Sequence, residues 1–103
     1  MRVIADWTAS YADPIRLRAG EAVRLTGRED IWDRHRWLWA EAGERVGWVP
    51  DDLVARGRAL RDYSALELTV KAGEEVEAGP AQHGWRWCSG ARGEGWVPEW
   101  CLV

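Results

Sequence analysis

Tryptophan side chains are the most distinctive chemical groups in this sequence. Nine are present, with two tyrosines and no phenylalanine. Four of them form W-x-W pairs, Trp37 with Trp39 and Trp85 with Trp87. An indole combines a large apolar face with one N–H donor, so it suits stacking against the apolar or cationic groups of a ligand. These residues therefore predict that the protein acts by binding a ligand.

The thiols and imidazoles offer a second possible chemistry. Cys88 and Cys101 could form a disulfide, bind a metal together with His35 and His83, or stay free. No C-x-x-C spacing is present and the two histidines lie in different halves of the chain, which argues against zinc. The N-terminus carries no secretion signal, so we expect free, partly buried thiols and no bound metal.

Catalytic motifs are not found in the sequence. It contains no Gly-rich phosphate loop, no nucleophile and base at a recognisable spacing, and no carboxylate pair that a small barrel could bury in a cleft. We therefore expect a non-enzymatic protein without a cofactor.

Charge and hydropathy narrow the choice of partner. The net charge is −3 and the isoelectric point is about 5.4, which disfavours nucleic acid and acidic membranes. This mild acidity suits a ligand that carries Arg or Lys. No apolar run is long enough to span a bilayer. These features favour a cytoplasmic, monomeric protein that binds a peptide or another protein.

The order of the motifs reveals an internal duplication. Four short stretches recur in the same order, and their separation falls from 56 to 53 and then to 48 residues along the chain. Insertions in surface loops produce such a drift, because loops tolerate length changes that strands do not. The matched stretches are residues 6–9 with 62–65, 20–23 with 73–76, 37–40 with 85–88, and 47–54 with 95–102.

Each copy of about fifty residues shows the pattern of short strands. The W-x-W stretches alternate between two faces, and Gly-containing turns follow them at residues 41–47 and 89–95. No segment has a convincing helical period. We predict an all-β fold of two small five-stranded barrels, at residues 1–55 and 58–103, with a short linker at 55–57.

The alternating pattern also predicts two equivalent barrel cores. The inward residues of the first are Val3, Ile15, Leu17, Val23, Leu25, Ala40, Val49 and Val54. Those of the second are Ala59, Leu68, Val70, Val76, Ala78, Cys88, Val97 and Leu102.

Taken together, the ordered motifs resemble a known family. "VIADW", "IRLRAGE", "RWLWA" and "GWVPDDLV", repeated as "ALRDY", "LTVKAGE", "WRWCS" and "GWVPEWCL", resemble a tandem pair of Src homology 3 (SH3) domains. The resemblance covers nearly the whole chain. It implies two barrels with n-Src loops at residues 27–36 and 79–84 and short 3₁₀ turns after Pro50 and Pro98.

The resemblance also implies a groove in each copy for an extended, proline-containing, basic peptide. Acidic RT-loop residues of this family hold a ligand Arg. The ligand-binding residues implied in copy one are Trp7, Asp13, Trp37, Trp48 and Pro50. Those implied in copy two are Tyr63, Glu67, Trp85, Trp96 and Pro98.

The sequence departs from the family pattern at four groove positions. Two groove tyrosines are replaced by Ala5 and Leu53 in copy one, and by Arg61 and Cys101 in copy two. Because Arg61 would place a cation in a proline slot, we expect copy one to bind. Two alternatives stay open: a bacterial SH3-like module that binds cell-wall peptides, and a structural pair of barrels that docks on a larger partner.

Overall fold

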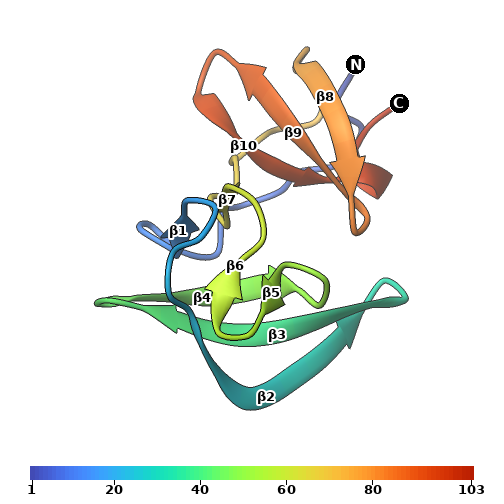
Figure 1. Ribbon diagram of the computed structural model, residues 1–103. Coiled ribbons are helices and arrows are strands. Elements are labelled where there is room, and N and C mark those ends of the chain that lie inside the picture. Colours follow the sequence, from blue (N-terminus) through green and yellow to red (C-terminus); the bar gives the residue numbers. More distant parts are fainter. The chain divides into compact units, whose positions relative to one another are not determined.

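The computed structural model describes all residues from 1 to 103, and it is built from short β-strands with one 3₁₀ turn. The strands (Figure 1) are β1 (Arg16–Leu17), β2 (Arg24–Trp32), β3 (His35–Ala42), β4 (Arg45–Pro50), β5 (Val54–Ala55), β6 (Arg58–Ala59), β7 (Tyr63–Ser64), β8 (Glu77–Gln82), β9 (Trp85–Gly90) and β10 (Gly93–Pro98). The 3₁₀ turn η1 spans Glu99–Cys101, directly after Pro98 as expected. The 3₁₀ turn expected after Pro50 is wrong, because residues 51–53 form a turn and a bend instead. No helix is long and apolar enough to cross a membrane. The expected all-β class is confirmed.

Two antiparallel three-stranded sheets form the framework. One has the order β2-β3-β4 and the other the order β10-β9-β8, and each follows the predicted W-x-W and G-W-V-P stretches. Two further pairs, β1 with β7 and β5 with β6, complete the strand pairing. The strands thus form four separate sheets rather than two closed five-stranded barrels.

Tight turns replace the expected n-Src loops. β2 and β3 are joined by Asp33 and Arg34, which both have positive φ, at 49° and 68°. β8 and β9 are joined in the same way by His83 and Gly84. Positive φ at both central residues is typical of the type I′ turn, whose twist matches that of the flanking strands. Most of the residues assigned to loops are therefore strand residues.

Residues 55–57 form a hairpin turn rather than a linker between domains. Val54 pairs with Ala59 and Ala55 with Arg58, so the chain reverses at Arg56 and Gly57. Both turn residues have positive φ, at 53° and 73°. The turn directs the first strand of the second repeat back onto the first repeat.

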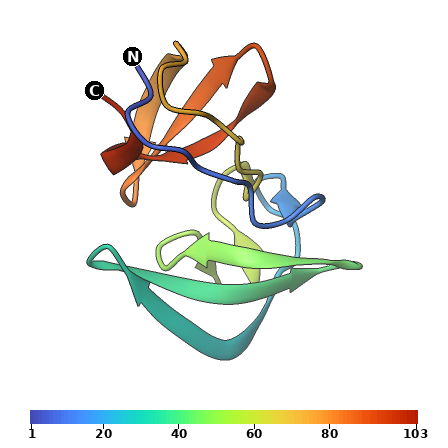
Figure 2. The ribbon, with the colours of Figure 1, turned by 180° about the vertical axis from the view of Figure 1, so that it is seen from behind.

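The chain consequently divides into two compact units that differ from the expected segments 1–55 and 58–103. The central unit is the continuous stretch 13–65. The terminal unit combines the N-terminal segment, residues 1–12, with residues 66–103. Figures 1 and 2 show the N-terminal segment running along the sheet of β8, β9 and β10. Each repeat has therefore given its first segment, residues 1–12 or 58–65, to the unit of the other. We call these two segments the first strands of the repeats, although residues 1–12 pair only through isolated bridges.

Backbone hydrogen bonds hold the N-terminal segment in the terminal unit. The Val3 N–H donates to Glu74 O at 2.8 Å, and the Val76 N–H donates to Met1 O at 2.9 Å. The two chain ends are also paired, because Arg2 and Val103 exchange two N–H···O bonds of 2.9 Å. These bonds pair the first three residues of the segment with the rest of the terminal unit.

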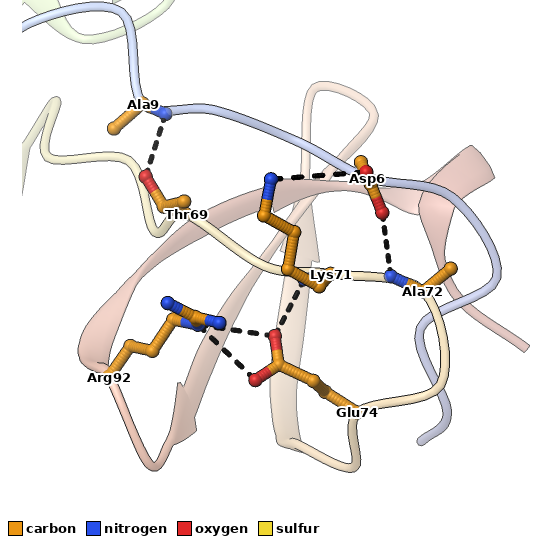
Figure 3. A network of polar contacts seen from close by, with 7 residues as sticks. All are labelled: Asp6, Ala9, Thr69, Lys71, Ala72, Glu74 and Arg92. Atoms are coloured by element: carbon orange, nitrogen blue, oxygen red, sulfur yellow. Dashed lines mark hydrogen bonds and ion pairs between the residues drawn. The ribbon is translucent and has the colours of Figure 1, made fainter.

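Side chains add to these backbone bonds (Figure 3). The Ala72 N–H donates to Asp6 Oδ1 at 2.8 Å, and the Ala9 N–H donates to Thr69 Oγ1 at 3.0 Å. Lys71 Nζ lies 3.9 Å from the other Asp6 oxygen. The N-terminal segment is therefore fixed at both of its halves.

The central unit repeats this pattern with the strand of the second repeat. The Ala59 N–H donates to Glu21 O at 2.9 Å, and the Val23 N–H donates to Gly57 O at 2.8 Å. The Ala19 N–H donates to Asp62 Oδ1 at 2.8 Å, as Ala72 does to Asp6 in the terminal unit. The two units are equivalent in hydrogen bonding even though their first strands are exchanged.

Burial agrees with most of the predicted core. Of the sixteen inward residues only Leu25, Val54 and Ala78 are not buried, and Leu25 is 39% exposed. Leu53, Cys101, Trp37 and Tyr63 are buried although they were not assigned to the core. Val3 belongs to the hydrophobic cluster of the terminal unit rather than to that of the first repeat. The alternation correctly predicted which faces are buried but not which unit each strand completes.

Candidate ligand-binding site

Three tryptophan rings gather in the terminal unit. The centroids of Trp7 and Trp85 are 5.3 Å apart and those of Trp7 and Trp100 are 6.0 Å apart, with interplanar angles of 83° in both pairs. Aromatic rings favour this edge-to-face geometry because the positive edge of one meets the negative face of the other. Trp7 and Trp85 are half-buried and Trp100 is 51% exposed, so part of the aromatic surface is accessible.

The surrounding strands set the position of each ring. Trp7 and Val70 exchange two backbone hydrogen bonds of 2.9 Å. Trp85 begins β9 and pairs with Pro98 at the end of β10, where the chain turns into η1. The Glu99 N–H donates to Gly84 O at 2.9 Å, which ties the start of η1 to the β8–β9 turn. Trp100 therefore projects from a short turn anchored beside Trp85.

A carboxylate lies against the central ring. Glu67 Oε1 accepts hydrogen bonds from Trp7 Nε1 at 3.0 Å, from the Ser10 N–H at 3.1 Å and from Ser10 Oγ at 3.0 Å. This network fixes the indole of Trp7 and puts one negative charge beside it. We call the set Trp7, Glu67, Trp85, Pro98 and Trp100 the aromatic site.

The corresponding positions of the central unit have a different character. Trp37 and Tyr63, which correspond to Trp85 and Trp7, are only 9% and 8% exposed. Asp52 stands where the terminal unit has Trp100, and its Oδ1 lies 3.1 Å from Arg61 Nη2. The central unit thus presents an ion pair where the terminal unit presents an accessible indole.

The structure regroups the expected site residues. Trp7 was expected with Trp37 and Pro50, and Tyr63 was expected with Trp85 and Pro98. Instead Trp7 lies in the unit of Trp85, and Tyr63 lies in the unit of Trp37. The exchange of first strands is the reason, because Trp7 and Tyr63 are both on the exchanged segments.

Trp48 and Trp96 lie on the hairpins of their units. Trp48 pairs across the strands with Trp39, with ring centroids 5.0 Å apart, and Trp96 pairs with Trp87 at 5.2 Å. The Arg28 guanidinium lies 5.0 Å from the centroids of both Trp39 and Trp48, within cation–π range. Packing within the hairpin accounts for these four rings.

The two acidic candidates have different surroundings. Asp13 pairs with Arg45, whose Nε lies 3.1 and 3.2 Å from its two oxygens, and the Asp13 side chain is 68% exposed. Glu67 is half-buried and contacts Trp7. Only Glu67 therefore lies beside an accessible aromatic surface. Pro50 and Pro98 are both fully buried and shape the chain rather than offering surface.

The two cysteines are free and fully buried, more deeply than expected. Burial raises the pKa of the Cys88 and Cys101 thiols, because the thiolate loses solvation in the core. Their folded-state pKa therefore exceeds that of the unfolded chain. Their contribution to stability is present below the unfolded pKa and is lost as the pH rises through the folded one.

Two contributors to the site were not predicted from the sequence. Neither Trp100 nor Ser10 was among the ligand-binding residues implied by the resemblance. The alignment of the repeats contained a signal for Trp100, since it stands where the first repeat has Asp52. Ser10 carries no such signal, because its role depends on the position of Glu67 in the fold.

The fold is all-β, and the aromatic site presents two half-buried indoles and one exposed indole beside a carboxylate. Residues 1–55 match the family model of the variant SH3 domain, and the chain belongs to this family. SH3 domains generally are non-catalytic modules that bind peptides or proteins. No curated protein and no solved structure matches the chain.

Proposed function

We propose that this protein is a tandem SH3 module that binds an extended, proline-containing, basic peptide at the aromatic site of its terminal unit. The observation that carries the proposal is the convergence of Trp7, Trp85 and the exposed Trp100 next to Glu67. The sequence led us to expect binding by the first repeat. The proposed binding unit is instead residues 66–103 completed by residues 1–12.

The proposed second SH3 domain is supported by the equivalence of the two units. Residues 1–55 match the family, and residues 58–103 repeat its motifs in order. The bond from the Ile4 N–H to Cys101 O, of 2.7 Å, corresponds to that from Leu60 to Leu53, of 2.8 Å. Equivalent hydrogen bonding at equivalent positions favours two copies of one fold.

Indole rings suit the apolar part of the proposed ligand. A proline-rich segment already adopts the polyproline II conformation in solution, so it loses little conformational entropy on binding. Its prolines would stack on the accessible faces of Trp85 and Trp100. The aromatic surface is continuous, because Trp7 contacts both of these rings.

Charge supports a basic residue in the ligand. All three hydrogen bonds to Glu67 go to Oε1, which leaves Oε2 to accept from a ligand Arg or Lys. Glu99, next to Trp100, is also exposed, but its Oε1 already pairs with Arg86 Nε at 3.6 Å, so Glu67 supplies the charge proposed to hold the ligand. With a single half-buried carboxylate and few anchors, we expect affinity in roughly the micromolar range.

The test is an NMR titration of the full chain with a panel of extended peptides. The panel contains proline-rich basic peptides, their proline-free and charge-reversed counterparts, and cell-wall stem peptides. We expect the indole N–H signals of Trp7, Trp85 and Trp100 to shift with the proline-rich basic peptides alone. Selective binding of a cell-wall peptide, or shifts confined to the central unit, would contradict the proposal.

Substitution of Trp100 tests the same site by calorimetry. Trp100→Ala should lower affinity at least about tenfold, which corresponds to about 1.4 kcal/mol, because an exposed aromatic anchor is lost. The matched control is Ile31→Ala, at a side chain 63% exposed in the central unit, which should leave affinity unchanged. Trp37→Ala should reduce stability with no specific loss of affinity, since Trp37 is buried in the central unit.

A further inference from the structure

The first strands of the two repeats are homologous, and each completes the unit of the other. Met1 O accepts a hydrogen bond from the Val76 N–H at 2.9 Å, and Gly57 O accepts the equivalent bond from the Val23 N–H at 2.8 Å. Nearly the same backbone ladder would form if each strand stayed with its own repeat. The backbone ladder alone therefore does not distinguish the exchanged pairing from the unexchanged one.

One pair of positions differs strongly in chemistry between the strands. The first repeat has Ala5 where the second has Arg61. Ala5 packs against the core of the terminal unit, next to Ile4, whose N–H donates to Cys101 O at 2.7 Å. Position 5 therefore adjoins the turn that carries Trp100.

The partners of these positions differ in a complementary way. In the central unit Arg61 pairs with Asp52 at 3.1 Å, and Asp52 is the counterpart of Trp100. Exchange thus matches the cation with the carboxylate and the small Ala5 with the large indole. In the unexchanged pairing Arg61 would adjoin Trp100, and Asp52 would have Ala5 beside it.

We propose that the exchange of first strands determines the specificity of this protein by keeping Arg61 out of the aromatic site and placing Trp7 in the site with Ala5 beside it. A guanidinium beside Trp100 would occupy the ring face that a proline needs and would repel a basic ligand. The inference about specificity rests on the proposed function, whereas the exchange itself is tested independently of any ligand.

The hairpin of β5 and β6 explains why exchange occurs within one chain. A two-residue turn at Arg56 and Gly57 closes a very short loop, so residues 58–65 pair locally with the first repeat. The place that residues 1–12 would take in the first repeat is then filled. The N-terminal segment is left to complete residues 66–103.

Disulfide trapping in the full chain tests the exchange. Arg2 and Glu75 are bridge partners, as are Ala22 and Arg58, and all four side chains are exposed. Paired strand residues lie within the Cα separation that a disulfide spans. We expect rapid crosslinking in Arg2→Cys with Glu75→Cys, and in Ala22→Cys with Arg58→Cys, when oxidised mildly and mapped by mass spectrometry.

The matched controls join the same positions in the unexchanged combination. They are Arg2→Cys with Ala22→Cys, and Arg58→Cys with Glu75→Cys. Faster crosslinking of these controls would overturn the proposal. A crosslink of residues 2 and 75 that joins two chains, seen as a dimer on a non-reducing gel, would overturn exchange within one chain.

Two charge substitutions test the role in specificity. Ala5→Arg should lower affinity for the basic peptide at least about tenfold, and Arg61→Ala should change it less than about twofold. An increase in affinity with Arg61→Ala, or no change with Ala5→Arg in a chain that still crosslinks at the exchanged pairs, would overturn it. Unchanged binding by Trp100→Ala would contradict the proposed function, and it would leave the crosslinking test of the exchange unaffected.

Discussion

At the scale of single residues, the two repeats have diverged at a few positions that set the character of each unit. Trp100 and Asp52 occupy equivalent places, yet one is an exposed indole and the other is an ion-pair partner of Arg61. Leu53 and Cys101, at another shared position, are both fully buried. Burial in the core is thus the same in both units, while the surface beside it is ionic in the central unit and aromatic in the terminal unit.

Glu67 is the residue on which the order of the aromatic site depends. Glu67→Gln keeps an acceptor but removes the charge that strengthens its bonds to Trp7 and Ser10, so it should lower the free energy of unfolding by about 1 kcal/mol. It should also weaken binding of basic peptides more than of neutral ones. Urea unfolding monitored by tryptophan fluorescence, with calorimetry of both peptides, measures these effects.

Asp13→Asn is the matched control for Glu67. Asp13 and Arg45 form an exposed ion pair, and such pairs contribute about 0 to 1 kcal/mol. The substitution should therefore leave both stability and affinity nearly unchanged. Equal effects of the two substitutions would show that Glu67 acts only as a surface charge.

At the scale of elements, the G-W-V-P strands β4 and β10 define both hairpins. Their glycines, Gly47 and Gly95, are buried and sit where another segment approaches closely. The tryptophan that follows packs across the hairpin, and the proline ends the strand before the turn. The repeated motif therefore reflects a requirement of packing as well as of binding.

Gly95→Ala should be among the most damaging single-methyl substitutions in the chain. A Cβ at this position would lie 2.7 Å from the Glu67 carbonyl carbon and 2.8 Å from Leu68 N, and backbone atoms move only with the segment. We expect a loss of about 3 kcal/mol in unfolding free energy, and weaker peptide binding because Glu67 is displaced.

Gly47→Ala provides the comparison at the same position of the first repeat. Its Cβ would meet a side-chain methyl, Ile15 Cγ2, at 2.8 Å, with the Ile15 backbone no closer than 3.4 Å. A side chain adjusts more readily than the backbone, so a loss of about 1 kcal/mol is expected. Thermal unfolding of both variants shows which substitution lowers stability more. A greater loss of stability for Gly47→Ala than for Gly95→Ala would contradict this account.

At the scale of the whole molecule, the unit defined by sequence and the unit defined by packing differ. The family match ends at residue 55, yet Ala59 and Tyr63 are buried in the central unit and Val3 is buried in the terminal one. A fragment cut at the family boundary lacks β6 and β7 of the central unit. It also contains residues 1–12, which belong to the terminal unit.

Fragments should reveal this difference. Residues 13–65 form one continuous compact unit and should give a dispersed amide NMR spectrum, whereas residues 1–55 should not. A unit of roughly fifty residues has little stability to spare, so losing the bonds of Ala59 and Gly57 should suffice to unfold it. A well-dispersed spectrum for residues 1–55 and a collapsed one for residues 13–65 would contradict the exchanged architecture.

Much of the local structure was determined by the sequence alone. Period-two alternation identified the buried faces, and the G-W-V-P and W-x-W stretches became the paired strands β3 with β4 and β9 with β10. These signals act between neighbours in the chain, so they do not depend on the rest of the fold. The motif order also pointed to the SH3 family, which the match over residues 1–55 confirms.

The tertiary structure decided which strand completes which unit, and with it the composition of the site. Residues 1–12 and 58–65 fit the same place with nearly the same hydrogen bonds, so no local pattern distinguishes their partners. The tight turn at Arg56 and Gly57 and the match of Arg61 with Asp52 favour one pairing. Trp7 therefore joins Trp85 and Trp100 rather than Trp37, because partner choice between equivalent strands depends on chain closure and long-range side-chain complementarity.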